Sequence, residues 1–182
     1  MEIEKIADDM NRTHMSKNFL VKTFFRVKTQ LSINMAGLKK GDLILDFGCG
    51  SGYLKNKLMR EGNNAIGYDV TPEHSDVEDY RTLKPNKILS LDVLEHISKE
   101  DIRKIIKDFK KMSESFYLVL AIPTENLLSR KMRKLFGKPE RVPDHITTLK
   151  EIVLIMKESD LEVIRKLNYF AITHIYLFSY GN

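Results

Sequence analysis

The stretch Leu45–Gly52, which reads LDFGCGSG, decides the fold, because its pattern predicts a buried strand that runs straight into a glycine-rich turn. The apolar run that begins at Leu43 is typical of a parallel strand covered on both faces. A helical pattern follows the turn and ends at Gly62. In an open α/β sheet, ligands lie beyond the carboxyl ends of the strands, where glycines let them approach the backbone. The stretch therefore predicts a ligand site on an α/β sheet.

Strand and helix patterns alternate on both sides of this stretch. We expect strands at residues 43–47, 65–70, 87–91, 115–122, 161–170 and 173–180. We expect helices at residues 18–36, 53–61, 98–112 and 148–159, and Ser98 and Thr148 resemble the first residues of capping boxes. The first of these helices should bury one face, made by Leu20, Phe24, Val27, Leu31 and Met35. The last two strands are joined too tightly for a crossover and must pair antiparallel. The prediction is an α/β sandwich, with a mostly parallel sheet, helices on both faces and an antiparallel C-terminal strand.

Length and composition limit the classes of protein to consider. The chain has 182 residues, 42% of them hydrophobic and 30% charged, which suits a single domain with one substantial core. Its single cysteine cannot form an intrachain disulfide or a cysteine-rich metal site. The N-terminus lacks the basic-then-apolar order of a signal peptide, and no apolar run is long enough to cross a bilayer. We therefore expect a cytoplasmic protein.

The net charge of +5 is local to one segment. Residues 130–141 contain six basic residues and one acidic residue, so the rest of the chain is neutral. Within 127–136, large apolar residues alternate with cations. Such a helix can lie on an anionic membrane surface or contact an acidic, lipid-like acceptor, but an amphipathic lid with a solvated charged face has the same pattern.

The spacing of the glycines argues against two common cofactors. A dinucleotide-binding turn requires glycine three positions after Gly50, where this chain has Tyr53. A phosphate-binding P-loop requires Lys and Ser or Thr after its last glycine, and these are missing.

In combination with three later motifs, the glycine turn resembles the class I S-adenosylmethionine-dependent methyltransferases. The later motifs are Gly67-Tyr68-Asp69, the stretch Leu91–Ile97 (LDVLEHI), and Asp144-His145-Ile146. The resemblance implies a Rossmann-like fold and a single methyltransferase domain over residues 1–182. It also implies a helical N-terminal cap at 1–36, an acceptor-side insert at 123–147, S-adenosyl-L-methionine as cofactor, and no requirement for a metal.

The resemblance also implies which residues contact the cofactor. Asp69, at the end of the second strand, would accept hydrogen bonds from the ribose hydroxyls, although a negative charge at the helix N-terminus beside Thr71-Pro72 is its alternative role. Asp46 would order the turn and reach the methionine end, and Cys49 would contribute its backbone amide rather than a nucleophilic thiol. The complete predicted set is Asp46, Gly48, Cys49, Gly50, Gly52, Asp69, Val70, Asp92 and Val93.

Two histidines are candidates for acceptor chemistry. His96 follows the strand that ends in Leu91, and His145 lies in the loop that covers the acceptor pocket in similar enzymes. Imidazole titrates near neutral pH, so either could take a proton from the acceptor, although a structural hydrogen bond is the alternative role for His96.

The family normally has a helix and a strand between the ribose carboxylate and the next acidic residue, but Asp76 follows closely after Asp69. The helix that follows the second strand should therefore be shortened or lost. Residues 76–79 could replace the family's adenine site or form a solvated acidic loop.

These features predict methyl transfer to an oxygen, nitrogen or carbon of a small-molecule or lipid-like acceptor. An RNA acceptor bound by the basic segment is a second hypothesis, and it is less favoured because the Asn/Asp-Pro-Pro-aromatic motif of adenine amino-methylating enzymes is replaced by LDVL at 91–94. A third hypothesis is a binding protein that keeps the cofactor pocket without catalysis.

Overall fold

The computed structural model describes residues 19–124, 126 and 145–181. The first 18 residues of the predicted cap, and most of the predicted insert with its basic segment, lie outside the described residues.

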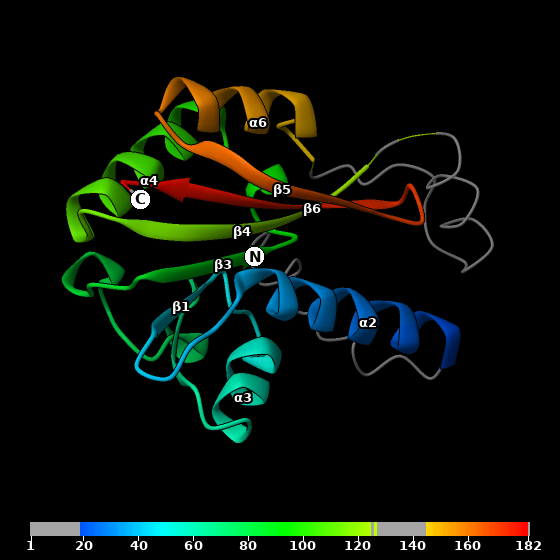
Figure 1. The fold of residues 1–182 in the computed structure, drawn as a ribbon, viewed down its shortest axis with the longest axis horizontal. Coiled ribbons are helices and arrows are strands. Elements are labelled where there is room, and N and C mark those ends of the chain that lie inside the picture. The colour runs from blue at the N-terminus through cyan, green and yellow to red at the C-terminus, as the bar shows by residue number, and fades with distance from the viewer. Residues whose placement is uncertain (1–18, 125, 127–144, 182) are drawn as a thin grey trace.

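A single six-stranded sheet forms the middle layer, with the strand order β2-β1-β3-β4-β6-β5 (Figure 1). The strands are β1 (Leu43–Phe47), β2 (Asn64–Tyr68), β3 (Lys87–Leu91), β4 (Phe116–Pro123), β5 (Glu162–Tyr169) and β6 (Thr173–Tyr180). The first four pair in parallel, whereas β6 runs antiparallel to both β4 and β5. The predicted mostly parallel sheet with an antiparallel C-terminal strand is confirmed.

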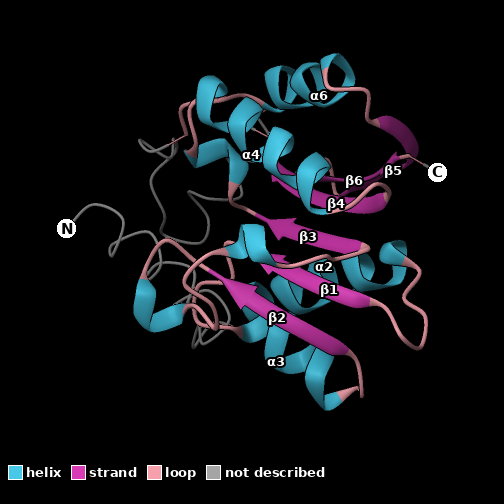
Figure 2. Cartoon of the chain, turned by 90° about the vertical axis from the view of Figure 1, so that its left-hand side faces the viewer, coloured by secondary structure: helices cyan, strands magenta, loops and turns pink. Residues whose placement is uncertain are grey.

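Helices cover both faces of the sheet, as predicted (Figure 2). On one face, α2 (Phe19–Ala36) and α3 (Tyr53–Arg60) cover a core that includes Ile44, Leu58 and Leu89. On the other, α4 (Lys99–Met112) and α6 (Leu149–Glu158) cover a second core that includes Phe109 and Phe178. None of the helices in the described residues is long and apolar enough to cross a membrane.

Local signals in the sequence explain where α4 and α6 begin. The Ser98 hydroxyl accepts a hydrogen bond from the Asp101 amide and so caps α4. Thr148 and Glu151 form a complete capping box at the start of α6, each side chain accepting from the other residue's backbone amide. Both caps satisfy amides that a helix N-terminus leaves without a partner.

The predicted buried face of α2 is wrong in part. Leu20 and Val27 are exposed, whereas the fully buried positions of this helix include Lys28, Thr29 and Ser32. The apolar spacing located the helix, but Lys28 and Thr29 point inward because they line the cleft described below, and the buried Ser32 hydroxyl donates to the Lys28 carbonyl within the helix. Hydrophobic periodicity cannot anticipate a buried face that contains functional polar groups.

The connection between β2 and β3, which the structure describes throughout, contains no α-helix. It carries only two short 3₁₀ turns, Pro72–His74 and Tyr80–Thr82. Thr71 precedes the first of them without making a side-chain cap. The shortening predicted from the close spacing of Asp69 and Asp76 is therefore confirmed, and this fully described stretch forms no strand between residues 70 and 85.

Candidate functional site

A cleft opens at the carboxyl ends of β1 and β3, where the chain switches from one face of the sheet to the other. The helix after β1 lies on one face and the helix after β3 on the opposite face (Figure 2). Such a switch point is where open α/β sheets bind ligands. The cleft is lined by Lys28, Thr29, Asp46, Gly48, Cys49, Gly50, Ser51, Tyr53, Leu54, Leu91 and Asp92.

The glycine turn bends sharply against the neighbouring strand. The amides of Gly48 and Cys49 both donate to the carbonyl of Tyr68, at 2.8 and 3.0 Å. Gly48 has a φ of 75°, and a Cβ there would lie 2.4 Å from a methyl group of Val93. Gly50 has a φ of 49°, but a Cβ at this residue would meet nothing within 4 Å among the described residues, so the turn opens towards the cleft here.

Asp69 is bound to the glycine turn. Its carboxylate accepts hydrogen bonds from the amides of Gly50 at 2.9 Å and Thr71 at 3.0 Å. Asp69, the residue predicted to bind the ribose, therefore lies against Gly50, the middle glycine of the turn. It stands beside the cleft and is not one of the residues that line it. Val70, the next predicted contact, is largely exposed.

Asp46 is a buried carboxyl in the cleft wall. One of its oxygens accepts a hydrogen bond from the Lys55 amide at 3.0 Å, which joins the end of β1 to the first turn of α3. Burial raises the pKa of Asp46 to about 7, although the Lys55 hydrogen bond acts in the opposite direction. A group that titrates near neutral pH can exchange its proton when a charged ligand binds.

The thiol of Cys49 is unsuited to nucleophilic chemistry. It is buried and donates towards the carbonyl of His74 at 3.3 Å. Burial, assisted by the negative charges of Asp46 and Asp69, raises the pKa of Cys49 to about 12. A thiolate is therefore scarce at neutral pH, which argues against a nucleophilic Cys49. The backbone amide of Cys49 donates to the Tyr68 carbonyl, so its predicted contact with the cofactor stays a prediction.

An ion pair that the sequence did not reveal lies in the cleft. Lys28, which α2 buries almost completely, donates a hydrogen bond from Nζ to Asp92 Oδ2. The ammonium also lies 4.5 Å from the centroid of the Phe25 ring. Asp92 has a φ of 58°, in the left-handed region that non-glycine residues seldom adopt. A lysine beside the apolar positions of a helix is a weak signal, because such residues usually face solvent.

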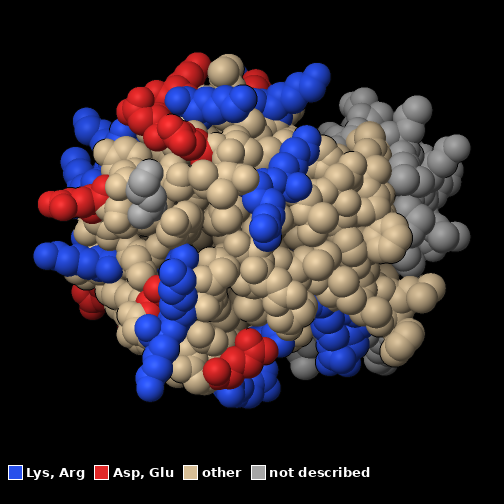
Figure 3. All heavy atoms as spheres, viewed as in Figure 1, with Lys and Arg blue, Asp and Glu red and all other residues tan. Residues whose placement is uncertain are grey.

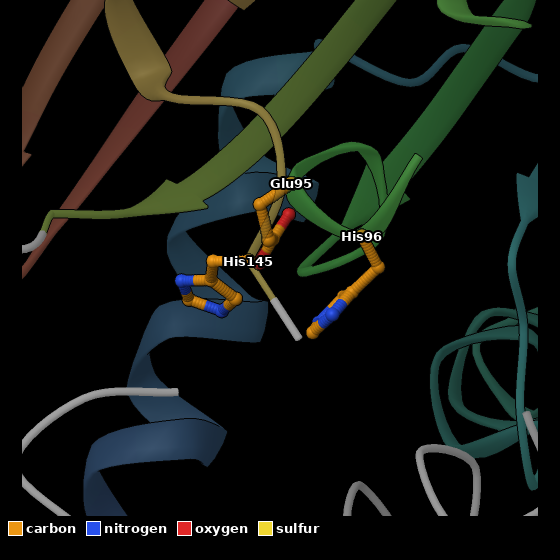
Figure 4. A group of neighbouring side chains, drawn as sticks. All are labelled: Glu95, His96 and His145. Atoms are coloured by element: carbon orange, nitrogen blue, oxygen red, sulfur yellow. The ribbon is translucent and has the colours of Figure 1, made fainter. Parts of the chain in front are cut away.

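The two predicted histidines are neighbours in the fold. The ring centroids of His96 and His145 are 4.9 Å apart, and Glu95 completes a group whose ligand atoms all lie within 4.8 Å of one another (Figure 4). Glu95 is buried, and neither of its carboxyl oxygens has a hydrogen-bond partner among the described residues. Burial and the nearby charge of Asp92 hold the pKa of Glu95 well above its usual range. Sequence reasoning identified the histidines but not the glutamate.

Asp76 has a structural role. Its carboxylate accepts from the Gly67 amide at 2.8 Å and from Lys55 Nζ at 2.6 Å, which connects the loop after β2 to α3. It does not line the cleft. The predicted adenine contact at residues 76–79 therefore stays a prediction.

Comparison with known structures shows the same fold in several methyltransferases. The magnesium protoporphyrin IX methyltransferase of Synechocystis PCC 6803, with bound SAH, is 20% identical at a TM-score of 0.66, and the match covers 95% of this chain and 93% of that one. A TehB-like SAM-dependent methyltransferase from Corynebacterium glutamicum is 13% identical at a TM-score of 0.67, covering 97% of both chains. The cyclopropane synthase MmaA2 of Mycobacterium tuberculosis is 16% identical at a TM-score of 0.62, and the match covers 85% of this chain and 67% of that one.

No curated protein matches the chain in sequence. The structural matches are too distant in sequence to show more than the fold. A family model described as a methyltransferase domain, however, matches residues 22–166, which include the glycine turn, Asp69 and the Glu95 group. The chain belongs to this methyltransferase domain family.

Proposed function

We propose that the protein transfers a methyl group from S-adenosyl-L-methionine to a small-molecule or lipid-like acceptor. The observation that carries this proposal is the hydrogen bond from the Gly50 amide to Asp69, beside a cleft at the switch point of the sheet. This hydrogen bond holds the carboxylate that we expect to bind the ribose next to Gly50, and the described residues leave open space around the Cβ position of that glycine. The chain contributes mainly by aligning donor and acceptor, and His96 and His145 are candidates for receiving a proton from the acceptor.

Calorimetry tests the cofactor assignment. The purified protein should bind S-adenosylhomocysteine, the demethylated product, and should not bind NAD at the same concentration. A preference for NAD would contradict the proposal. Methyl transfer from radiolabelled S-adenosylmethionine to a panel of acceptors then separates an enzyme from a protein that only binds the cofactor.

Apolar side chains at the open end of α2 support an acceptor with an apolar body. Phe19, Leu20 and Phe170 are exposed there, and Phe24 stacks on Tyr169 at 4.7 Å between ring centroids. Phe19 is separated from Lys28, in the cleft, by about 14 Å of helix at 1.5 Å per residue. Where Figure 3 colours the surface around this end, it is mostly tan, with a group of basic side chains at its lower edge. An acceptor could therefore lie along α2 with its reactive end at the cleft.

Cofactor affinity should depend on pH through Asp46. Because its pKa is raised, Asp46 holds a proton below about pH 7 in the folded protein without ligand. The contribution of Asp46 to the free energy of unfolding is therefore largest below about pH 4 and is lost as pH rises towards 7. The positively charged amino group of the ligand favours the ionised carboxylate. We expect S-adenosylhomocysteine to bind about tenfold more weakly at pH 5.5 than at pH 7, and binding at pH 6 to release a proton.

Calorimetry in buffers of different ionisation enthalpy measures that proton release. The matched control is Asp46→Asn, which keeps the size of the side chain and should bind weakly with a flatter pH dependence. A wild-type affinity that does not change over this pH range would show that Asp46 does not contact the charged end of the ligand.

The basic segment at 130–141 provides a separate prediction about the acceptor. If it attracts phosphates or anionic head groups, replacing Arg130, Lys131, Arg133 and Lys134 by Gln should lower affinity for anionic vesicles, and added salt should weaken wild-type binding. Cofactor affinity should stay the same. An RNA acceptor would instead show a salt dependence with a log-log slope of several units. Binding that neither salt nor the substitutions alter would favour a solvated lid.

A further inference from the structure

The Glu95, His96 and His145 group has the composition of a metal site. Two imidazoles and one carboxylate form the protein ligands of several catalytic zinc and non-haem iron sites, which keep further coordination positions open. Figure 4 shows the three side chains converging from two separate segments of the chain. Their ligand atoms lie within 4.8 Å of one another, so small side-chain rotations would bring all three to bonding distance of one ion.

The burial of the Glu95 carboxyl group also points to a bound cation. It is 2% exposed, and within the described part of the chain both of its carboxyl oxygens are buried without a hydrogen-bond partner. A buried polar group without a partner costs about 1–3 kcal/mol, and more when it is charged, so such groups in native proteins call for an explanation. A bound cation would satisfy both oxygens at once.

The backbone holds the two histidine-bearing segments together. The amides of Ile146 and Thr147 donate to the Glu95 carbonyl at 2.9 and 3.2 Å. The Thr147 hydroxyl donates to the Ile97 carbonyl at 2.6 Å. Three hydrogen bonds therefore fix the loop of His145 against the turn that carries Glu95 and His96, so the group is largely assembled before any ligand arrives.

We propose that Glu95, His96 and His145 bind a divalent transition-metal ion beside the cofactor cleft. Two imidazole ligands favour Zn²⁺, Mn²⁺ or Fe²⁺ over Mg²⁺, which prefers oxygen ligands. This replaces the expectation, taken from the resemblance, that the site needs no metal. The role of the ion rests on the proposed function. Its open positions would hold an oxygen or nitrogen of the acceptor, and its charge would lower the pKa of a bound hydroxyl, whose proton leaves to water.

Metal titration of an untagged protein, first stripped with EDTA, tests the site. Zn²⁺ should bind the wild type with a stoichiometry of one, and an excess of Mg²⁺ should displace little of the bound Zn²⁺. Co²⁺ bound in its place should give a visible absorption band. His96→Gln, His145→Gln and Glu95→Gln should each lower Zn²⁺ affinity at least about tenfold. The control His74→Gln removes a half-buried histidine outside the group and should leave Zn²⁺ affinity unchanged.

A second variant and a second readout keep the result interpretable. His145→Cys replaces one zinc ligand by another and should recover much of the affinity that His145→Gln loses. Urea unfolding reports whether each variant is folded, and S-adenosylhomocysteine binding is measured separately on the same samples. Failure of the wild type to bind one equivalent of Zn²⁺, or equal affinity in wild type and His145→Gln, would overturn the metal site. Zn²⁺ binding without S-adenosylhomocysteine binding would support the metal site and overturn the cofactor assignment.

Discussion

Gly48→Ala should abolish detectable binding of S-adenosylhomocysteine, a loss of at least about a hundredfold, or about 2.7 kcal/mol. The new Cβ would lie 2.4 Å from a methyl group of Val93, a distance that neither side can tolerate without moving. The left-handed backbone at this residue would cost alanine about a further 1–2 kcal/mol. Because Gly48 also donates to the Tyr68 carbonyl, the adjustment would displace the turn that faces the ligand. Calorimetry measures the binding, and urea unfolding measures the stability.

Two other glycines separate the possible causes. Gly62 has a similar φ of 81° but open space around its Cβ position, so Gly62→Ala should lose stability by about 1–2 kcal/mol and keep full affinity for the ligand. Gly50 also has open space, but on the cleft side, so Gly50→Ala should lose affinity without a collision inside the protein. If Gly62→Ala weakened binding as much as Gly48→Ala, the effect would be one of general stability.

Asp69→Ala should weaken binding of S-adenosylhomocysteine by roughly tenfold to a hundredfold or more. Each hydrogen bond from a ribose hydroxyl to the charged carboxylate contributes about 1.5–3 kcal/mol. The substitution also removes the acceptor for the Gly50 amide, which would loosen the turn. Competition calorimetry on the folded variant measures the change in affinity.

The matched control is Glu61→Ala. Glu61 is an exposed carboxylate at the end of α3, paired with Lys57 on the same helix, and it is not one of the cleft-lining residues. This variant should bind the ligand as the wild type does. Unchanged affinity in a folded Asp69→Ala protein would remove Asp69 from the cofactor site and with it the main support for the ribose assignment.

The sequence predicted the fold well where local chemistry alone determines the structure. The run from Leu43 to Phe47 forms a strand of the predicted extent, and Thr148 with Glu151 forms the predicted capping box. The short link between the last two strands forced an antiparallel pair because no crossover fits in so few residues. Each of these features is encoded within a few neighbouring positions.

Features that depend on distant parts of the chain were harder to predict. The inward orientation of Lys28 depends on Asp92, which a strand far along the chain brings to the same cleft. The contact between His96 and His145 joins residues far apart in the sequence, and it depends on the hydrogen bonds that Ile146 and Thr147 donate to the Glu95 carbonyl. Glu95 stands within the LDVLEHI motif, but the sequence assigned it no role, because a glutamate beside a short turn is usually solvated and only the packing shows that its carboxyl is buried.

A crystal structure of the protein soaked with S-adenosylhomocysteine tests the central claim most directly. The account predicts ligand density in the cleft at the ends of β1 and β3, with the ribose hydroxyls within hydrogen-bond distance of the Asp69 carboxylate and the amino acid end beside Asp46. Density at another surface, or an empty cleft at saturating ligand concentration, would contradict it.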